Sequence, residues 1–192
     1  MKKILMANLN ESAELHREIL RDENLIENIY LSVQKIIEAI ESGNKIIIAG
    51  NGGSAADAQH FVAELIGRFQ LERNGFPAIA LTTNTSLITA LANDYSFDTI
   101  FARQLETLAR KGDIFIAITT SGNSSNIISA LQIAKKLGIE SIGILGKDGG
   151  KTKDLSTIPI IVPHNITARI QEIHILIIHS ICDIVEKTLT GN

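Results

Sequence analysis

The stretch Lys45-Ile-Ile-Ile-Ala-Gly-Asn-Gly-Gly-Ser54 decides the fold class, because it joins an unbroken apolar run to a glycine-rich turn. A short apolar run that ends in glycine is typical of a strand buried on both faces, as in parallel sheets covered by helices. The stretch Ile116-Ala-Ile-Thr-Thr-Ser-Gly-Asn-Ser124 repeats this pattern. Because ligands of open α/β sheets bind at the carboxyl ends of strands, we expect both loops to border one site.

Apolar runs predict five strands, at 45–50, 77–81, 113–118, 140–145 and 158–162. Helical patterns lie between them and on both sides of them, at 54–68, 85–93, 98–110, 125–137 and 167–189, with two helical stretches inside 5–42. Strands that alternate with helices through short loops predict a parallel sheet. The expected fold is therefore α/β, a three-layer sandwich with a five-stranded, mostly parallel sheet.

The last expected helix is apolar on nearly every side, through Ile170, Ile173, Leu176, Ile177, Ile178, Ile181, Ile184 and Val185. A helix of this kind must be buried, so we expect a buried C-terminal helix that also contributes to an oligomer interface. No linker or low-complexity segment divides the chain. Residues 1–192 are therefore expected to form a single domain, with 1–43 as a helical extension packed on it.

The composition excludes several classes of protein. An apolar fraction of 45% over 192 residues excludes disorder, and a net charge of -3 leaves no basic surplus for nucleic acid or an anionic membrane. The aromatic fraction of 4% argues against a platform on which bases stack. The single cysteine, Cys182, excludes a disulfide framework and a multi-cysteine zinc site. No apolar run suits a signal peptide or a membrane span, so we expect a cytoplasmic protein with a reduced thiol.

The loop that follows residue 118 has the composition of a phosphate site. It offers the hydroxyls of Thr119, Thr120, Ser121 and Ser124 beside the backbone N–H groups of a helix start. The loop contains no Lys or Arg and lacks the P-loop spacing, which disfavours a nucleoside triphosphate. An ordinary helix cap and turn is the alternative, as it is for the loop 50–54, which departs from the dinucleotide pattern.

Polar residues on two helices are further candidates. His60 and Glu64 lie four residues apart and share a helix face, as a base with an acid, two metal ligands or a simple surface contact. Gln171, His174 and His179 interrupt the apolar last helix, where an unpaired polar group costs about 1–3 kcal/mol. Three interruptions within nine residues favour a site over one isolated structural histidine.

Other polar residues have a simple structural alternative. Asn93 and Asp94 could bind hydroxyls or merely form a turn, and Arg169 could hold a charge or cap a loop. Lys147 is a possible anion contact within a glycine-rich turn at a strand end. Cys182 lies on an apolar helix face, which favours packing over a nucleophilic role.

Taken together, these segments resemble the bacterial phosphoheptose isomerases, members of the sugar isomerase (SIS) domain superfamily. The resemblance covers the chain from about residue 10 and rests on motifs in the same order: Gly50-Asn-Gly-Gly-Ser-Ala-Ala-Asp-Ala-Gln-His-Phe61, Ala63-Glu-Leu65 with Gly67-Arg68, Ala92-Asn-Asp94, Thr120-Ser-Gly-Asn-Ser124, Gly146-Lys-Asp-Gly-Gly-Lys151 and Arg169-Ile-Gln-Glu-Ile-His174. It implies a flavodoxin-like SIS fold and a homotetramer with sites between subunits. It also implies the isomerisation of D-sedoheptulose 7-phosphate to D-glycero-D-manno-heptose 7-phosphate, the first step toward ADP-heptose for lipopolysaccharide.

The resemblance also implies roles for individual residues. The family's zinc ligands match His60, Glu64, Gln171 and His179, with one zinc ion per subunit. Its substrate contacts match Asn51, Gly52, Gly53, Glu64, Asn93, Asp94, Thr119, Thr120, Ser121, Ser124 and Gln171. Its acid–base pair matches Glu64 and His179, which suits an enediol mechanism with a base at carbon and an acid at oxygen. Two positions depart from the family: Thr119 replaces a common Ser, and Ala168 stands where some members carry an acid.

Non-catalytic relatives provide the main alternative. A replication initiator-associating protein has a similar fold and binds a partner protein, but it lacks the counterparts of Glu64 and His179. A sugar-phosphate-sensing regulator would need a DNA-reading segment, which this chain lacks. An isomerase for another phosphosugar, such as a pentose 5-phosphate, is the third alternative.

Overall fold

A single five-stranded sheet in the order β2-β1-β3-β4-β5 organises the molecule, and every neighbouring pair of strands is parallel. The strands are β1 (Ile46–Gly50), β2 (Ala78–Ala80), β3 (Ile114–Thr119), β4 (Glu140–Gly146) and β5 (Ile158–Val162). The computed structural model describes residues 1–191 and confirms the predicted α/β sandwich. The strand order reverses between β1 and β3, and such a reversal marks the ligand-binding crevice of an open α/β sheet.

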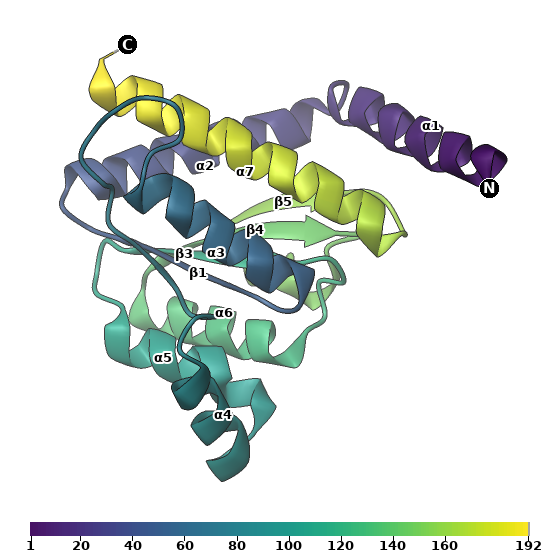
Figure 1. The fold of residues 1–192 in the computed structure, drawn as a ribbon. Helices are drawn as coiled ribbons and strands as arrows, with labels where there is room; N and C mark the ends of the chain where they lie inside the picture. Colours follow the sequence, from purple (N-terminus) through teal and green to yellow (C-terminus); the bar gives the residue numbers. More distant parts are fainter. Residues whose placement is uncertain (192) are drawn as a thin grey trace.

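Helices cover both faces of the sheet (Figure 1). They are α1 (Lys2–Ile19), α2 (Glu23–Glu41), α3 (Gly53–Ile66), α4 (Thr85–Asp94), α5 (Ile100–Leu108), α6 (Ser125–Leu137) and α7 (Thr167–Thr190), with short 3-10 turns η1 (Phe97–Thr99) and η2 (Gly150–Thr152). Side chains of β1 alternate between two cores: Ile46 and Ile48 pack with α2, α3 and α7, and Ile47 packs with α5 and α6. This alternation explains why the strand is apolar throughout.

Helix α7 is buried along the side that faces the sheet and open along the other within a single chain. Ile173, Ile177 and Ile181 are 2% exposed or less, whereas Leu176 and Ile184 are 42% and 43% exposed. The sheet, α2 and α3 cover only the side of α7 that faces them, so its other apolar side chains meet solvent in a single chain. The expected oligomer interface at this helix stays a prediction.

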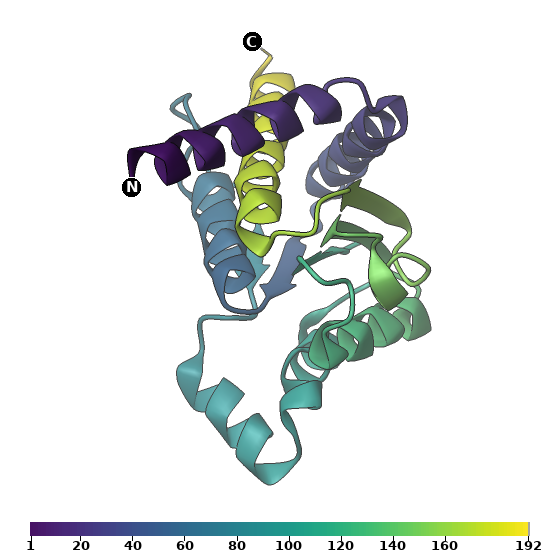
Figure 2. The same ribbon diagram turned by 90° about the vertical axis from the view of Figure 1, so that its right-hand side faces the viewer.

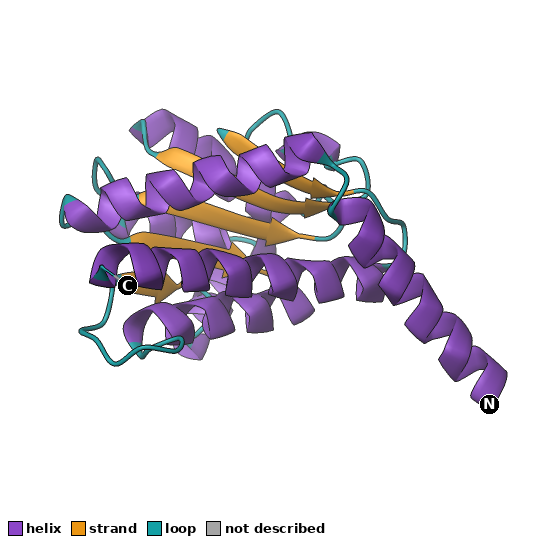
Figure 3. Ribbon diagram, turned by 90° about the horizontal axis from the view of Figure 1, so that it is seen from above, coloured by secondary structure: helices purple, strands orange, loops and turns teal. Residues whose placement is uncertain are grey.

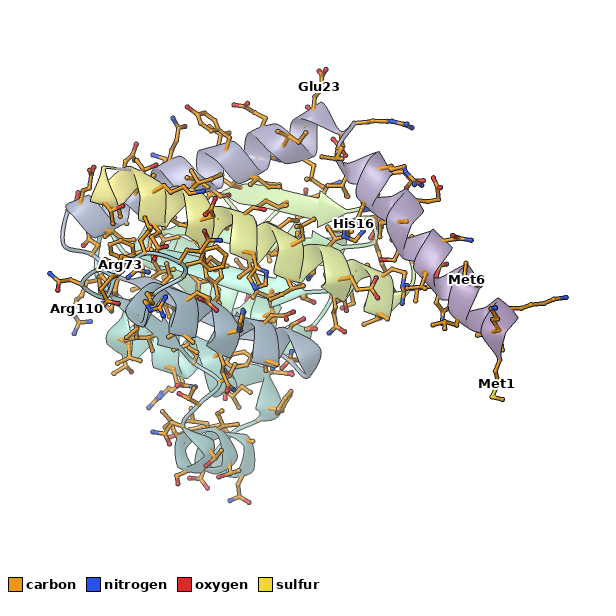
Figure 4. The ribbon with its side chains drawn as sticks, turned by 45° about the horizontal axis from the view of Figure 1, so that its top comes forward. Met1, Met6, His16, Glu23, Arg73 and Arg110 are labelled. Carbon is orange, nitrogen blue, oxygen red and sulfur yellow. The ribbon has the colours of Figure 1, made fainter. Side chains whose placement is uncertain are left out.

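Helix α1 projects from the rest of the fold (Figures 1 and 3). Its last turns are anchored, since Leu15 and Ile19 are buried. Nearer the middle of the helix, the Arg169 guanidinium donates to the carbonyl of Asn8 at 2.6 Å. The first turns expose apolar residues, and Met1 and Met6 lie on the part of α1 that extends away from the sheet (Figure 4). Among residues 1–191, no helix combines the length and the apolar character needed to cross a membrane.

His174 ties α7 to the sheet. Its side chain is fully buried, and Nε2 lies 3.0 Å from the carbonyl oxygen of Leu145 in β4. Burial lowers the pKa of His174 to about 4, although the backbone hydrogen bond works in the opposite direction. The imidazole is therefore neutral near pH 7, and Nε2–H donates to the strand.

This buried histidine predicts a loss of stability in mild acid. In the unfolded chain an imidazole has a pKa near 6.5, so between about pH 6.5 and 4 only the unfolded state binds the proton. Stability present above pH 6.5 should fall as the pH drops toward 4. We expect the free energy of unfolding to fall more steeply in wild type than in His174→Gln, by about 1 kcal/mol per pH unit. The glutamine keeps a hydrogen-bond donor but does not titrate. Urea unfolding across this pH range measures the difference, and parallel curves for the two proteins would contradict it.

Candidate active site

Hydroxyl groups converge after β3. A small cavity of about 70 Å³ is lined by Asn51, Ser54, Ile118, Thr119, Thr120, Ser121 and Ser124. Thr119 Oγ1 lies 3.4 Å from Ser121 Oγ and 3.3 Å from Ser124 Oγ. Ser124 occupies the N-cap position of α6, but its side chain makes no capping hydrogen bond. Because this hydroxyl points toward Thr119 and does not cap the helix, its orientation favours an anion site over an ordinary helix cap.

The hydroxyl loop is supported by the turn that follows β4. The backbone N–H of Thr152 donates to the carbonyl of Gly122 at 3.0 Å, and that of Lys151 donates to Asn123 Oδ1 at 3.2 Å. Gly122 has a φ of +65°, and a Cβ atom there would lie 2.1 Å from the carbonyl oxygen of Gly149. Only glycine allows this close approach of the two backbones. Lys147, the possible anion contact, is exposed in the same turn with a φ of +59°.

A pair of amides joins the two expected loops. Asn51 Nδ2 donates to Asn126 Oδ1 at 2.8 Å, and Asn126 Nδ2 donates back to Asn51 Oδ1 at 2.9 Å. Asn126 is 1% exposed and lies in the first turn of α6. This pair holds the first loop against the second, as the strand order predicts. Asn126 was not among the predicted site residues, although an amide among the apolar residues of α6 is a detectable signal.

Gln171 reaches the same region from α7. A Cβ atom on Gly53 would lie 2.0 Å from Gln171 Nε2, so the amide rests directly on the backbone at the start of α3. Glycine at position 53 makes room for this side chain. The structure therefore brings together the predicted substrate contacts Asn51, Gly53 and Gln171.

A second polar cluster lies farther along α3 and α7. His60 Nε2 is 2.8 Å from His179 Nε2 and 3.3 Å from Glu64 Oε1. The two imidazole rings meet edge to face, with centroids 5.1 Å apart. Since two ring nitrogens at this distance share one proton, one imidazole donates to the other. The predicted acid–base pair Glu64 and His179 is thus joined through His60.

Within one chain, this cluster is distant from the hydroxyl loop. Glu64 follows Ser54 by ten residues, which corresponds to about 15 Å along a helix axis. His179 follows Gln171 by eight residues, or about 12 Å. One chain therefore does not bring Gln171 to the histidines, so the four predicted ligands do not meet within a single subunit.

The chemistry of the cluster fits zinc better than its geometry does. Imidazole and carboxylate are ordinary zinc donors, and tetrahedral zinc with bonds of about 2.0–2.1 Å holds its donor atoms about 3.3 Å apart. The pair His60–Glu64 has this spacing, whereas His60 and His179 are closer. Over residues 1–191, no three His, Cys, Asp or Glu side chains form a group that could hold a metal ion.

The remaining candidates lie outside both clusters. Asn93 and Asp94 are exposed at the end of α4, which stands apart from the sheet in Figure 2, and Asn93 Nδ2 donates to Asp94 Oδ1 at 2.9 Å. Arg169 pairs with Glu172 at 2.8 Å and anchors α1, so its contacts are structural. Cys182 is buried, and burial raises the pKa of its thiol, in agreement with a packing role.

Comparison with known proteins identifies the family. The family model described as SIS domain matches residues 9–146. The phosphoheptose isomerase of Clostridium acetobutylicum is 50% identical, over all of this chain and 97% of that relative. The solved structure of phosphoheptose isomerase from Neisseria gonorrhoeae is 40% identical with a TM-score of 0.90, over 97% of this chain and 98% of that one. The corresponding enzyme from Francisella tularensis is 36% identical with a TM-score of 0.92, over 96% and 97% of the two chains. The chain therefore belongs to the SIS-domain family and, within it, to the phosphoheptose isomerases.

Proposed function

We propose that this protein isomerises D-sedoheptulose 7-phosphate to D-glycero-D-manno-heptose 7-phosphate, the first step of ADP-heptose biosynthesis. Membership of the phosphoheptose isomerases supports the proposal. The observation that carries it within this chain is the contact of one imidazole, His60, with both Glu64 and His179. A carboxylate and an imidazole held side by side are the groups that an aldose–ketose isomerisation needs.

Each side chain has a defined task in this proposal. Glu64 takes the proton from the carbon beside the carbonyl and returns it to the neighbouring carbon. His179 gives a proton to the carbonyl oxygen and removes one from the adjacent hydroxyl, so that an enediol forms and collapses. The hydroxyls of Thr119, Thr120, Ser121 and Ser124 and the N-terminus of α6 hold the phosphate without a basic side chain.

The separation within one chain supports a site built from more than one subunit. Seven bonds link the phosphorus of a heptose 7-phosphate to its second carbon, which span about 8 Å when extended. This is shorter than the distance of about 15 Å along α3 from Ser54 to Glu64. We therefore propose a site in which the phosphate loop of one copy faces the acid–base pair of another, within the cytoplasmic homotetramer that the resemblance implies.

Zinc is part of the same proposal. His60, Glu64 and His179 do not form a three-donor metal group in the described chain, so the two imidazoles would have to move apart to hold the ion with Glu64. Gln171 of the partner subunit would reach it, because Gln171 and His179 are too far apart along one helix. A bound zinc ion polarises a carbonyl oxygen as a Lewis acid.

The direct test is turnover of sedoheptulose 7-phosphate, followed by NMR with the purified, zinc-supplemented protein. We expect the aldose signals to appear at the expense of the ketose. A pentose 5-phosphate, tested in parallel, should be a poor substrate. If neither sugar reacts with or without added zinc, the enzymatic proposal is wrong and a binding function for the SIS domain is favoured.

Replacing the proposed base tests the chemistry. Glu64→Gln removes the carboxylate charge but keeps the shape, so the rate should fall by at least about 100-fold while circular dichroism stays unchanged. Glu72→Gln is the matched control, because Glu72 is an exposed carboxylate in the loop after α3. A rate for Glu64→Gln close to that of the control would show that Glu64 is not the base.

Metal content tests the ligand set. After zinc loading and removal of free metal, elemental analysis should find one zinc ion per subunit in the wild type. His60→Gln should lose most of it, because one donor is gone. His16→Gln, which changes a histidine of α1, should retain it. Equal zinc content in the two variants would contradict the proposed ligands.

A further inference from the structure

A buried carboxylate lies next to the acid–base cluster without being part of it. Glu186 in α7 is 1% exposed, and its two oxygens accept hydrogen bonds from the backbone N–H groups of Phe69 at 2.9 Å, Gln70 at 2.6 Å and Leu71 at 2.8 Å. Arg73 Nε donates to the same carboxylate at 2.9 Å. A charge is kept in an aliphatic core only when it is paired and hydrogen-bonded, and Glu186 meets this requirement fully.

Arg73 connects this carboxylate to the end of α3. Its guanidinium donates to the carbonyl of Glu64 at 2.8 Å and to that of Leu65 at 2.9 Å. The last carbonyls of a helix have no hydrogen-bond donors within the helix, and the Arg73 guanidinium provides donors for two of them. The guanidinium also stacks 3.9 Å from the ring centroid of Phe76, and the Arg73 side chain is 5% exposed. Arg73 thus fixes the turn of helix that carries the Glu64 carboxylate.

Phe69 connects the same carboxylate to His179. Its backbone N–H binds Glu186, and its ring lies against the His179 imidazole, with centroids 5.7 Å apart and planes inclined by 40°. Glu186 and His179 are seven residues apart on α7, and two turns of helix place them on the same side. The loop after α3 is therefore held against α7 at the level of the imidazole.

We propose that the buried pair Glu186–Arg73 is a positioning device for the isomerase site, which orients Glu64 through the last turn of α3 and His179 through the ring of Phe69. Glu186, Arg73 and Phe69 are positioning residues under this proposal, since each acts through a neighbour of the reacting groups. The inference rests on the proposed function for its kinetic consequences, while the geometry it describes can be tested without turnover. Displacing a reacting group by about 1 Å can cost about 100-fold in rate, so the effect should be large.

The chain offers a matched control for a purely structural role. Asp113 is also a buried carboxylate, 2% exposed, and it accepts from the backbone N–H of Lys45 at 3.0 Å and of Arg110 at 2.7 Å. Lys45 Nζ pairs with it at 2.5 Å. This pair lies at the amino ends of β1 and β3, whereas the hydroxyl loop follows the carboxyl end of β3. Asp113→Asn should lower stability without moving Glu64 or His179.

The test compares Glu186→Gln, Phe69→Leu and Asp113→Asn at a temperature at which circular dichroism shows each protein folded. For sedoheptulose 7-phosphate, we expect kcat to fall about 100-fold in Glu186→Gln and about 10-fold in Phe69→Leu, with KM changed less than about twofold. Asp113→Asn should keep kcat within about twofold of wild type. Phe69→Leu keeps the backbone hydrogen bond to Glu186, so this variant tests the positioning role if Glu186→Gln does not fold.

A second measurement does not depend on activity. NMR spectra of the imidazole nitrogens of His60 and His179 should change in Glu186→Gln and Phe69→Leu but not in Asp113→Asn. If the wild type does not turn over the sugar, the proposed function fails, and these ring signals alone decide the positioning role. Unchanged ring signals in the two site variants would overturn the inference, as would an equal change in Asp113→Asn.

Discussion

Burial of a parallel sheet on both faces is the constraint on which the rest of this structure depends. Because all five strands run in one direction, every strand ends at the same edge, and each loop that follows opens there. In the order β2-β1-β3-β4-β5, the chain leaves β1 toward one edge of the sheet and leaves β3 toward the other. The loops that follow these two neighbouring strands therefore face each other across a crevice. The amide pair Asn51–Asn126 lies in this crevice, beside the cavity formed by the hydroxyl loop.

The second constraint is an aliphatic core that contains few polar groups. Buried polar side chains need hydrogen-bond partners, and three of them find partners on a loop or at a strand end. His174 binds the end of β4, Asn126 binds the first loop, and Glu186 binds the segment after α3. These contacts are few and specific, and they fix the irregular segments that carry the candidate site.

Much of the fold could be predicted from the sequence, since apolar runs and helical spacing locate the strands and the main helices. The residues that hold the site together could not. Arg73 and Glu186 are 113 residues apart, and nothing in their local sequence indicates that they pair. The sequence also did not indicate which subunit supplies each ligand, because residues that share a side of a helix, such as Gln171 and His179, can still be far apart along its axis. Residue types predicted the chemistry, and the three-dimensional arrangement decided which groups meet.

The arrangement of the two polar clusters connects the proposed assembly to the chemistry. Helices α3 and α7 run side by side in the same direction, since Gly53 lies beside Gln171 at one end and His60 beside His179 farther along. Each chain therefore presents a phosphate loop at one end of this helix pair and an acid–base cluster near the other. Under the proposed function a sugar phosphate is too short to reach both, so a second copy would supply the missing half. The exposed apolar side chains of α1 and the open side of α7 are the surfaces that such a copy would cover, because apolar area removed from water stabilises association.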